Sequence, residues 1–201
     1  MILEMPDSSD NDPFQSWEKI GEYIKSEKLR LKFMTATHNH SDHFSTHPQF
    51  HKKFPDIPIV VNSYFFRKRS LIEFISAEDL ESGYNQEPST IHKGVPICCF
   101  KGELFETHLG GEPLYLIQAP KHSWSDTLIV FRGTMITGDW WLGPGDPNPS
   151  QIPVEVINRS IDRVENFCRE RRYQINTMMS VHANEFRSNF KFFKLMEETR
   201  P

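Results

Sequence analysis

A run of six residues, HNHSDH, contains four side chains that can bind a metal ion. It follows directly on the apolar stretch 31–37, which has the pattern of a strand. If the chain stays extended, alternation turns His38, His40 and Asp42 to one side, while His43 can turn to the other. One short loop at the end of a strand would then supply two neighbouring metal ions. The alternative is a histidine-rich surface loop whose side chains contact only water.

Three further residues that can bind a metal ion lie just beyond the ends of expected strands. They are His122, Asp139 and His182, which follow the stretches 114–118, 134–137 and 175–181 respectively. Loops at strand ends build many of the sites of α/β proteins. A single histidine or aspartate in such a place is usually structural. Three of them, together with the first motif, indicate a metal centre.

Strand-like and helix-like hydrophobic periods alternate along the chain, which predicts a layered α/β (α+β) fold. A length of 201 residues, of which 37% are hydrophobic, is enough for one domain with a core. Strands are expected at 2–5, 31–37, 57–61, 96–100, 105–109, 114–118, 127–131, 134–137 and 175–181. Helices are expected from Asp12 to Ile24, from Ser45 to Lys53, over 63–76 and from Pro153 to Glu170, with a loop over 77–94.

Composition and charge argue against several classes of partner. The net charge of −4 gives no overall attraction to nucleic acid or to anionic membranes. No stretch approaches the roughly 18 apolar residues of a membrane span, and the first residues do not have the pattern of a signal peptide. Three cysteines form neither a disulfide framework nor a CxxC motif. We therefore expect a cytoplasmic protein that binds neither nucleic acid nor membrane.

The order of these motifs resembles the metallo-β-lactamase superfamily of metallo-hydrolases, over about residues 1–187. The resemblance implies one four-layer αββα domain spanning 1–201. It implies two metal ions, zinc by expectation, with iron or manganese as alternatives. One ion would be held by His38, His40 and His122, the other by Asp42, His43 and His182, with Asp139 and a hydroxide bridging the two ions.

Members of the superfamily normally begin with several strands, and residues 1–7 here resemble the last of them. The sequence therefore predicts a domain that is shortened at its N-terminus and lacks the first strands. Such a domain would expose a sheet edge, through which the chain could form oligomers.

The resemblance implies a hydrolase whose bridging hydroxide attacks the ester, thioester or lactone carbonyl of a small substrate. We expect Asp42 to orient the hydroxide and to accept its proton. Trp124, Trp140 and Trp141 flank the expected ligands and either form a wall of the substrate pocket or pack in the core. Ser123 and Ser125 are expected to form hydrogen bonds within their loop. His47 and His51, one helical turn apart, are expected to face solvent.

Two alternatives remain at this point. The same ligands would suit a di-iron redox enzyme, which usually needs an electron-donor domain that these residues do not contain. The chain could also be an inactive or partner-dependent shortened form, with poor metal occupancy. The substrate itself is not readable from the sequence, because loops rather than the fold select it.

Overall fold

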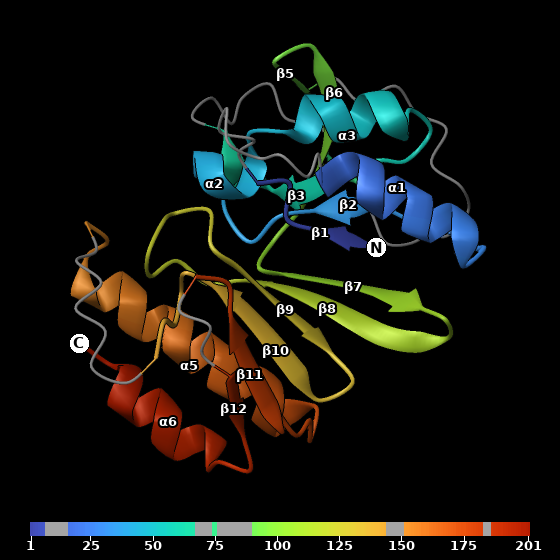
Figure 1. Ribbon diagram of the computed structural model, residues 1–201. Coiled ribbons are helices and arrows are strands. Elements are labelled where there is room, and N and C mark those ends of the chain that lie inside the picture. The colour runs from blue at the N-terminus through green and yellow to red at the C-terminus, as the bar shows by residue number, and fades with distance from the viewer. Residues whose placement is uncertain (7–15, 67–73, 76–89, 144–150, 183–185) are drawn as a thin grey trace. The chain divides into compact units, whose positions relative to one another are not determined.

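The computed structural model describes residues 1–6, 16–66, 74–75, 90–143, 151–182 and 186–201 (Figure 1). These residues form two compact units, 1–101 and 102–201, and each unit is described by itself. The single domain, the four-layer arrangement and the absence of the first strands stay predictions. Within the described ranges, no helix is both long enough and apolar enough to cross a membrane.

The first unit contains two small sheets and helices that pack against them. Strands β1 (Ile2–Leu3) and β2 (Met34–Thr35) pair in parallel. In the second sheet, β6 (Val95–Phe100) lies between β3 (Val60–Asn62) and β4 (Phe74–Ile75), and β5 (Thr90–His92) also pairs with β6. A parallel bridge between Met34 and Ile59 links the two sheets.

Three helices accompany these strands within the described part of the unit, and its core is aromatic and aliphatic. The helices are α1 (Ser16–Ser26), α2 (Ser41–Phe44) and α3 (His47–Lys53). Phe44 of α2 and Phe50 of α3 are buried in one cluster with Met34 of β2 and with Ile59, its bridge partner. The start predicted for α1, at Asp12, lies outside the described residues.

The helix predicted over 63–76 is wrong at both of its described ends, and residues 67–73 lie outside the described chain. Its start is a single 3₁₀ turn, η1 (Ser63–Phe65), and the side chain of Asn62 accepts the N–H of Tyr64 there. Phe74–Ile75 is instead a strand, because it pairs with Cys99 and Phe100 of β6. Non-local pairing outweighs the local helical period. The predicted loop over 77–94 likewise ends in a strand, β5, and its residues 77–89 lie outside the described chain.

The second unit is a six-stranded sheet with helices α5 and α6 alongside it (Figure 1). The sheet order is β12-β11-β10-β9-β8-β7. Its strands are β7 (Leu104–Leu109), β8 (Glu112–Gln118), β9 (Thr127–Phe131), β10 (Thr134–Gly138), β11 (Thr177–Ser180) and β12 (Phe186–Ser188). The predicted strands of this half are confirmed, and β12 is an additional strand.

Two-residue turns set the register of this sheet. Gly110 and Gly111 join β7 to β8 with φ angles of 59° and 84°, and Arg132 and Gly133 join β9 to β10 with 48° and 73°. Positive φ angles at both turn residues give the turn a backbone twist that matches the twist of the two strands it joins. Both connections are therefore two-residue β-hairpins.

Helices α5 (Val154–Glu170) and α6 (Phe192–Thr199) bury an apolar face with the sheet. Ile157, Ile161 and Val164 of α5 pack in one cluster with Val130 and Met178 of the strands. Val154, the first residue of α5, is 50% exposed, because the buried stripe begins one turn later. One face of the sheet packs against the helices, so alternate strand residues point to its other face. The candidate ligands follow the ends of the strands.

Candidate metal centre

The loop after β2 carries the ligand-rich motif of the first unit. Its residues do not stay extended as expected, because α2 starts directly after His40. The carbonyl of His40 accepts the N–H groups of His43 and Phe44, at 3.1 and 3.0 Å. Asp42 and His43 therefore lie on a helical turn, while His38 and His40 precede it. The simple alternation predicted for the motif is wrong, since side chains on a helical turn do not alternate.

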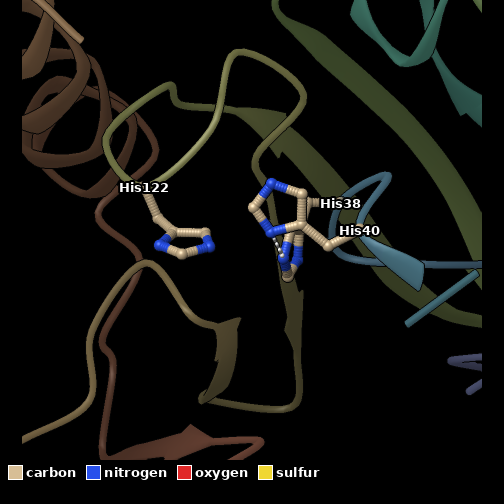
Figure 2. A group of neighbouring side chains, drawn as sticks. All are labelled: His38, His40 and His122. Atoms are coloured by element: carbon tan, nitrogen blue, oxygen red, sulfur yellow. Dashed lines mark hydrogen bonds between the residues drawn. The ribbon is translucent and has the colours of Figure 1, made fainter. Parts of the chain in front are cut away.

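The imidazoles of His38 and His40 turn nitrogen atoms toward each other (Figure 2). Nε2 of His38 and Nδ1 of His40 are 3.0 Å apart, and this contact is the dashed line of Figure 2. A tetrahedral zinc ion with bonds of about 2.0–2.1 Å holds two nitrogen ligands about 3.3 Å apart. The pair is therefore close to the spacing of two ligands on one metal ion, and it is also at hydrogen-bond distance.

The second pair of the loop is His43 and Asp42. Nε2 of His43 lies 3.7 Å from Oδ2 of Asp42. The His43 side chain is fully buried, while that of Asp42 is 51% exposed. His43 is thus enclosed by the core, while the carboxylate of Asp42 can contact water.

Glu4, which the sequence pattern did not single out, contacts this loop. Glu4 follows β1, and its carboxylate accepts both the backbone N–H and the hydroxyl of Thr37. Oε1 of Glu4 also lies 3.3 Å from Nδ1 of His43. The only sequence signal was an acidic residue at the end of the expected strand 2–5.

In the second unit, three strand ends bring the other candidate ligands to one edge of the sheet. β10 and β11 are parallel, and β8 runs parallel to both because β9 is antiparallel to β8 and β10. His122, Asp139 and His182 each follow the end of one of these strands. Carboxyl ends of parallel strands meet at the same edge. The expectation that these residues occupy strand ends is confirmed.

Asp139 lies between the two histidines of this unit. Its Oδ2 is 3.6 Å from Nε2 of His122, and its Oδ1 is 3.7 Å from Nε2 of His182. Each carboxylate oxygen thus faces a different imidazole. Gly138, just before it, has a φ of 56°, a conformation that glycine adopts without steric cost. The chain therefore turns sharply at the strand end and places the carboxylate between the two imidazoles.

The buried carboxylate of Asp126 holds the loop that carries His122. His122 is labelled in Figure 2. The sequence pattern did not single out Asp126. Oδ2 of Asp126 accepts the N–H groups of Lys121, His122 and Ser123 at 2.9, 2.6 and 2.9 Å. Oδ1 accepts the Ser123 hydroxyl at 2.6 Å, and that hydroxyl lies 3.0 Å from the hydroxyl of Ser125. Burial raises the pKa of Asp126, and these hydrogen bonds act against that rise. The loop roles expected of Ser123 and Ser125 are confirmed.

The three tryptophans occupy different environments. Trp140 and Trp141 are 0% and 3% exposed and belong to the core cluster of the second unit. The carbonyl of Trp140 accepts a hydrogen bond from Nζ of Lys121 at 2.8 Å, which ties the His122 loop to the turn after β10. Trp124 is 48% exposed. Core packing, the alternative left open by the sequence, is thus the observed environment of Trp140 and Trp141, and contact of any of the three with substrate stays a prediction.

His47 was expected at the surface but is fully buried. Its Nδ1 donates to the carbonyl of Phe44 at 2.6 Å, and its ring stacks on that of Phe44 with centroids 4.3 Å apart. The helical period placed it on the outer face, but the irregular step between α2 and α3 turns it inward. His47 is therefore a structural histidine.

The fold is similar to solved structures of metallo-β-lactamase superfamily proteins. A metallo-β-lactamase from Pontibacter korlensis matches with a TM-score of 0.59 and 15% identity, covering 90% of this chain and 74% of that chain. An archaeal metallo-β-lactamase superfamily protein from Sulfolobus tokodaii matches with a TM-score of 0.58 and 20% identity, covering 98% of this chain and 72% of that one. At these identities the likeness shows the fold.

One curated sequence is also similar, and no family model matches. The coenzyme F420H2 oxidase of Methanocaldococcus jannaschii is 26% identical over an alignment of 123 residues, and the match covers 58% of this chain. The match spans about a quarter of that oxidase, 24% of its length. The chain has the α/β fold of the metallo-β-lactamase superfamily and carries clusters of histidine and aspartate that suit metal ions.

Proposed function

From the metallo-β-lactamase superfamily fold of this chain we propose that it is a metal-dependent hydrolase with a dinuclear centre. The observation that carries the proposal is Asp139, whose two carboxylate oxygens face different histidines at 3.6 and 3.7 Å. A carboxylate placed in this way can hold one metal ion on each oxygen. In the loop of the first unit, the 3.0 Å contact of His38 and His40 supplies a pair of nitrogens with ligand spacing.

The ligand assignment follows the resemblance seen in the sequence. His38, His40 and His122 are assigned to one metal ion, and Asp42, His43 and His182 to the other, with Asp139 shared. Five imidazoles and two carboxylates form this set. Imidazole-rich sets suit zinc, and iron and manganese are the other candidates.

Two metal ions bound there would lower the pKa of a water molecule and polarise a carbonyl oxygen. The residues of the chain then have distinct tasks. Asp42, half exposed beside the buried His43, orients the attacking water and takes up its proton. Trp124, also half exposed, contacts the apolar part of a small ester, thioester or lactone.

A second candidate function is a di-iron redox reaction, and the similarity to the F420H2 oxidase favours it. The similarity is at 26% identity and covers a quarter of that protein. The donor set here contains more imidazole than the carboxylate-rich sets typical of di-iron proteins. We therefore place hydrolysis first.

The proposal is tested by elemental analysis of the purified chain together with assays on esters, thioesters and lactones. We expect about two zinc ions per chain, and hydrolysis that stops when a chelator removes them. His40→Ala and His182→Ala, one ligand from each unit, should each lower the metal content. His51→Ala is the matched control, because His51 is a histidine outside the ligand set, and it should keep the metal. Iron with oxidase activity would favour the second function, and a folded wild-type chain that binds no metal would refute both.

A further inference from the structure

Glu4 is placed against the ligand-rich loop by its own backbone. Its N–H donates to the carbonyl of Thr35 at 3.0 Å, and the N–H of Met5 donates to the carbonyl of His43 at 2.7 Å. These two bonds join the chain on either side of Glu4 to the start and the end of the loop. The φ of Glu4 is 67°, which residues with a side chain rarely adopt. This backbone conformation directs the carboxylate to the loop.

Thr37 connects that carboxylate to two histidines. Its hydroxyl lies 2.5 Å from Oε1 of Glu4, and its backbone N–H lies 3.2 Å from Oε2. A carboxylate only accepts, so the single hydroxyl proton of Thr37 points to Glu4. The lone pairs of the hydroxyl oxygen then face Nδ1 of His38 at 3.2 Å and Nδ1 of His43 at 3.5 Å. Because this oxygen can only accept from them, each Nδ1 is the donor and carries the proton.

A neutral imidazole carries one N–H, so a proton on Nδ1 leaves the lone pair on Nε2. Nε2 of His38 is the atom that faces His40, and Nε2 of His43 is the atom that faces Asp42. For His43, Oε1 of Glu4 itself lies 3.3 Å from Nδ1 and adds a second acceptor. Both histidines thus keep their lone pairs on the sides where the other candidate ligands lie.

We propose that Glu4 and Thr37 are positioning residues that fix the tautomers of His38 and His43. The proposal rests on the proposed function in one respect, namely that the two Nε2 atoms bind metal ions. Glu4 and Thr37 act through the histidines, at the ring nitrogens opposite those that would contact a metal ion. Groups of this kind orient histidine ligands in many metal sites, and their removal typically weakens metal binding about 10–100-fold.

The tautomers can be read directly by ¹⁵N NMR of histidine-labelled, metal-free full-length chain. We expect the Nδ1–H form for His38 and His43 in the wild type. Glu4→Ala releases the Thr37 hydroxyl to rotate, so both histidines should become mixtures of tautomers. Thr37→Val keeps the volume and removes the acceptor of His38, whereas Thr37→Ser keeps the hydroxyl and should restore the wild-type tautomer. Glu18→Gln removes a surface carboxylate of the same unit and is the control.

Zinc affinity, measured by competition with a chelator, is the second readout. Glu4→Ala and Thr37→Val should bind zinc about 10–100-fold more weakly, and Thr37→Ser and Glu18→Gln should stay within a few-fold of wild type. Unchanged tautomers and unchanged affinity in Thr37→Val would overturn the inference. If Glu4→Ala does not fold, the comparison of valine with serine at Thr37 decides. A wild-type chain without zinc affinity would refute the proposed function, while the tautomer comparison would still decide this inference.

Discussion

Asp126 accepts the backbone N–H of His122 at 2.6 Å, so the position of a candidate ligand depends on a buried carboxylate four residues further along the chain. The same oxygen accepts the N–H groups of both neighbours of His122. Three consecutive N–H groups converging on one carboxylate oxygen hold the whole loop in one conformation. The imidazole therefore projects from a rigid support, although it lies in a loop.

Replacing Asp126 by alanine should destabilise the protein and weaken its metal site. The change leaves three N–H groups and the Ser123 hydroxyl without their acceptor in a buried place. Hydrogen bonds to a charged group contribute about 1.5–3 kcal/mol each and are not additive, so we expect a loss of about 3 kcal/mol in the free energy of unfolding. We also expect zinc affinity to fall about 10–100-fold. Urea unfolding and chelator competition measure the two effects.

Ser125→Ala is the control for this experiment, because it removes a hydroxyl from the same loop and leaves the four bonds to Asp126 in place. It should behave nearly like the wild type. Asp126→Asn keeps one acceptor oxygen and should fall between the two. If Asp126→Ala had wild-type stability and wild-type zinc affinity, the supporting role of this carboxylate would be wrong.

The second unit was more predictable from sequence than the first, because its structure is set by local signals. The turn glycines Gly111 and Gly133 fix two hairpins, and the hairpins fix the register of four strands. The candidate ligands then follow the strand ends. In the first unit, by contrast, β4 exists only because Phe74–Ile75 pairs with β6, some 25 residues further along the chain. No local period carries that information.

The candidate ligands were visible in the sequence because metal binding restricts residue type as well as spacing. The residues that hold these ligands in place were not visible in the sequence. Glu4 and Thr37 are separated by 33 positions, and only the fold brings them together. Asp126 is local, but an aspartate near two serines is common in loops of any kind. The burial of Trp140 and of His47 was also beyond the sequence, since both lie where a regular element gives way to an irregular one.

Trp140→Ala and Trp124→Ala should separate stability from substrate contact. Trp140 is fully buried in the core cluster, so its truncation should cost about 3–5 kcal/mol of unfolding free energy. Trp124 is 48% exposed, and its truncation should change stability by no more than about 0.5 kcal/mol. If Trp124 contacts substrate, its loss raises KM on an active ester or thioester. An unchanged KM would remove Trp124 from the substrate site.

The buried thiols should make stability fall at alkaline pH. Burial raises the pKa of Cys99 and of Cys168 to about 12. In the unfolded chain a thiol ionises near pH 8.5, so above that pH the folded state holds a proton that the unfolded state has lost. Stability therefore decreases as pH rises, by about 1.4 kcal/mol per pH unit for each thiol. Cys168→Ala removes one thiol, so its loss of stability between pH 9 and pH 10.5 should be shallower by about that slope. Equal slopes in urea unfolding would contradict the prediction.

The bridging role proposed for Asp139 predicts a different metal loss from that of a ligand to a single metal ion. Asp139 offers one oxygen to the side of His122 and the other to the side of His182, whereas Asp42, 3.7 Å from His43, is assigned to a single metal ion. Asp139→Ala should therefore weaken both metal ions and reduce the metal content below one per chain. Asp42→Asn should remove one metal ion and leave the other.

Because the loss of supporting groups already costs about 10–100-fold in affinity or activity, Asp139→Ala should lower kcat/KM by more than about 100-fold. Elemental analysis after dialysis distinguishes the two variants. A preparation of Asp139→Ala that kept two metal ions would show that this carboxylate does not bridge them, and would leave Asp139 as an electrostatic neighbour of the two histidines.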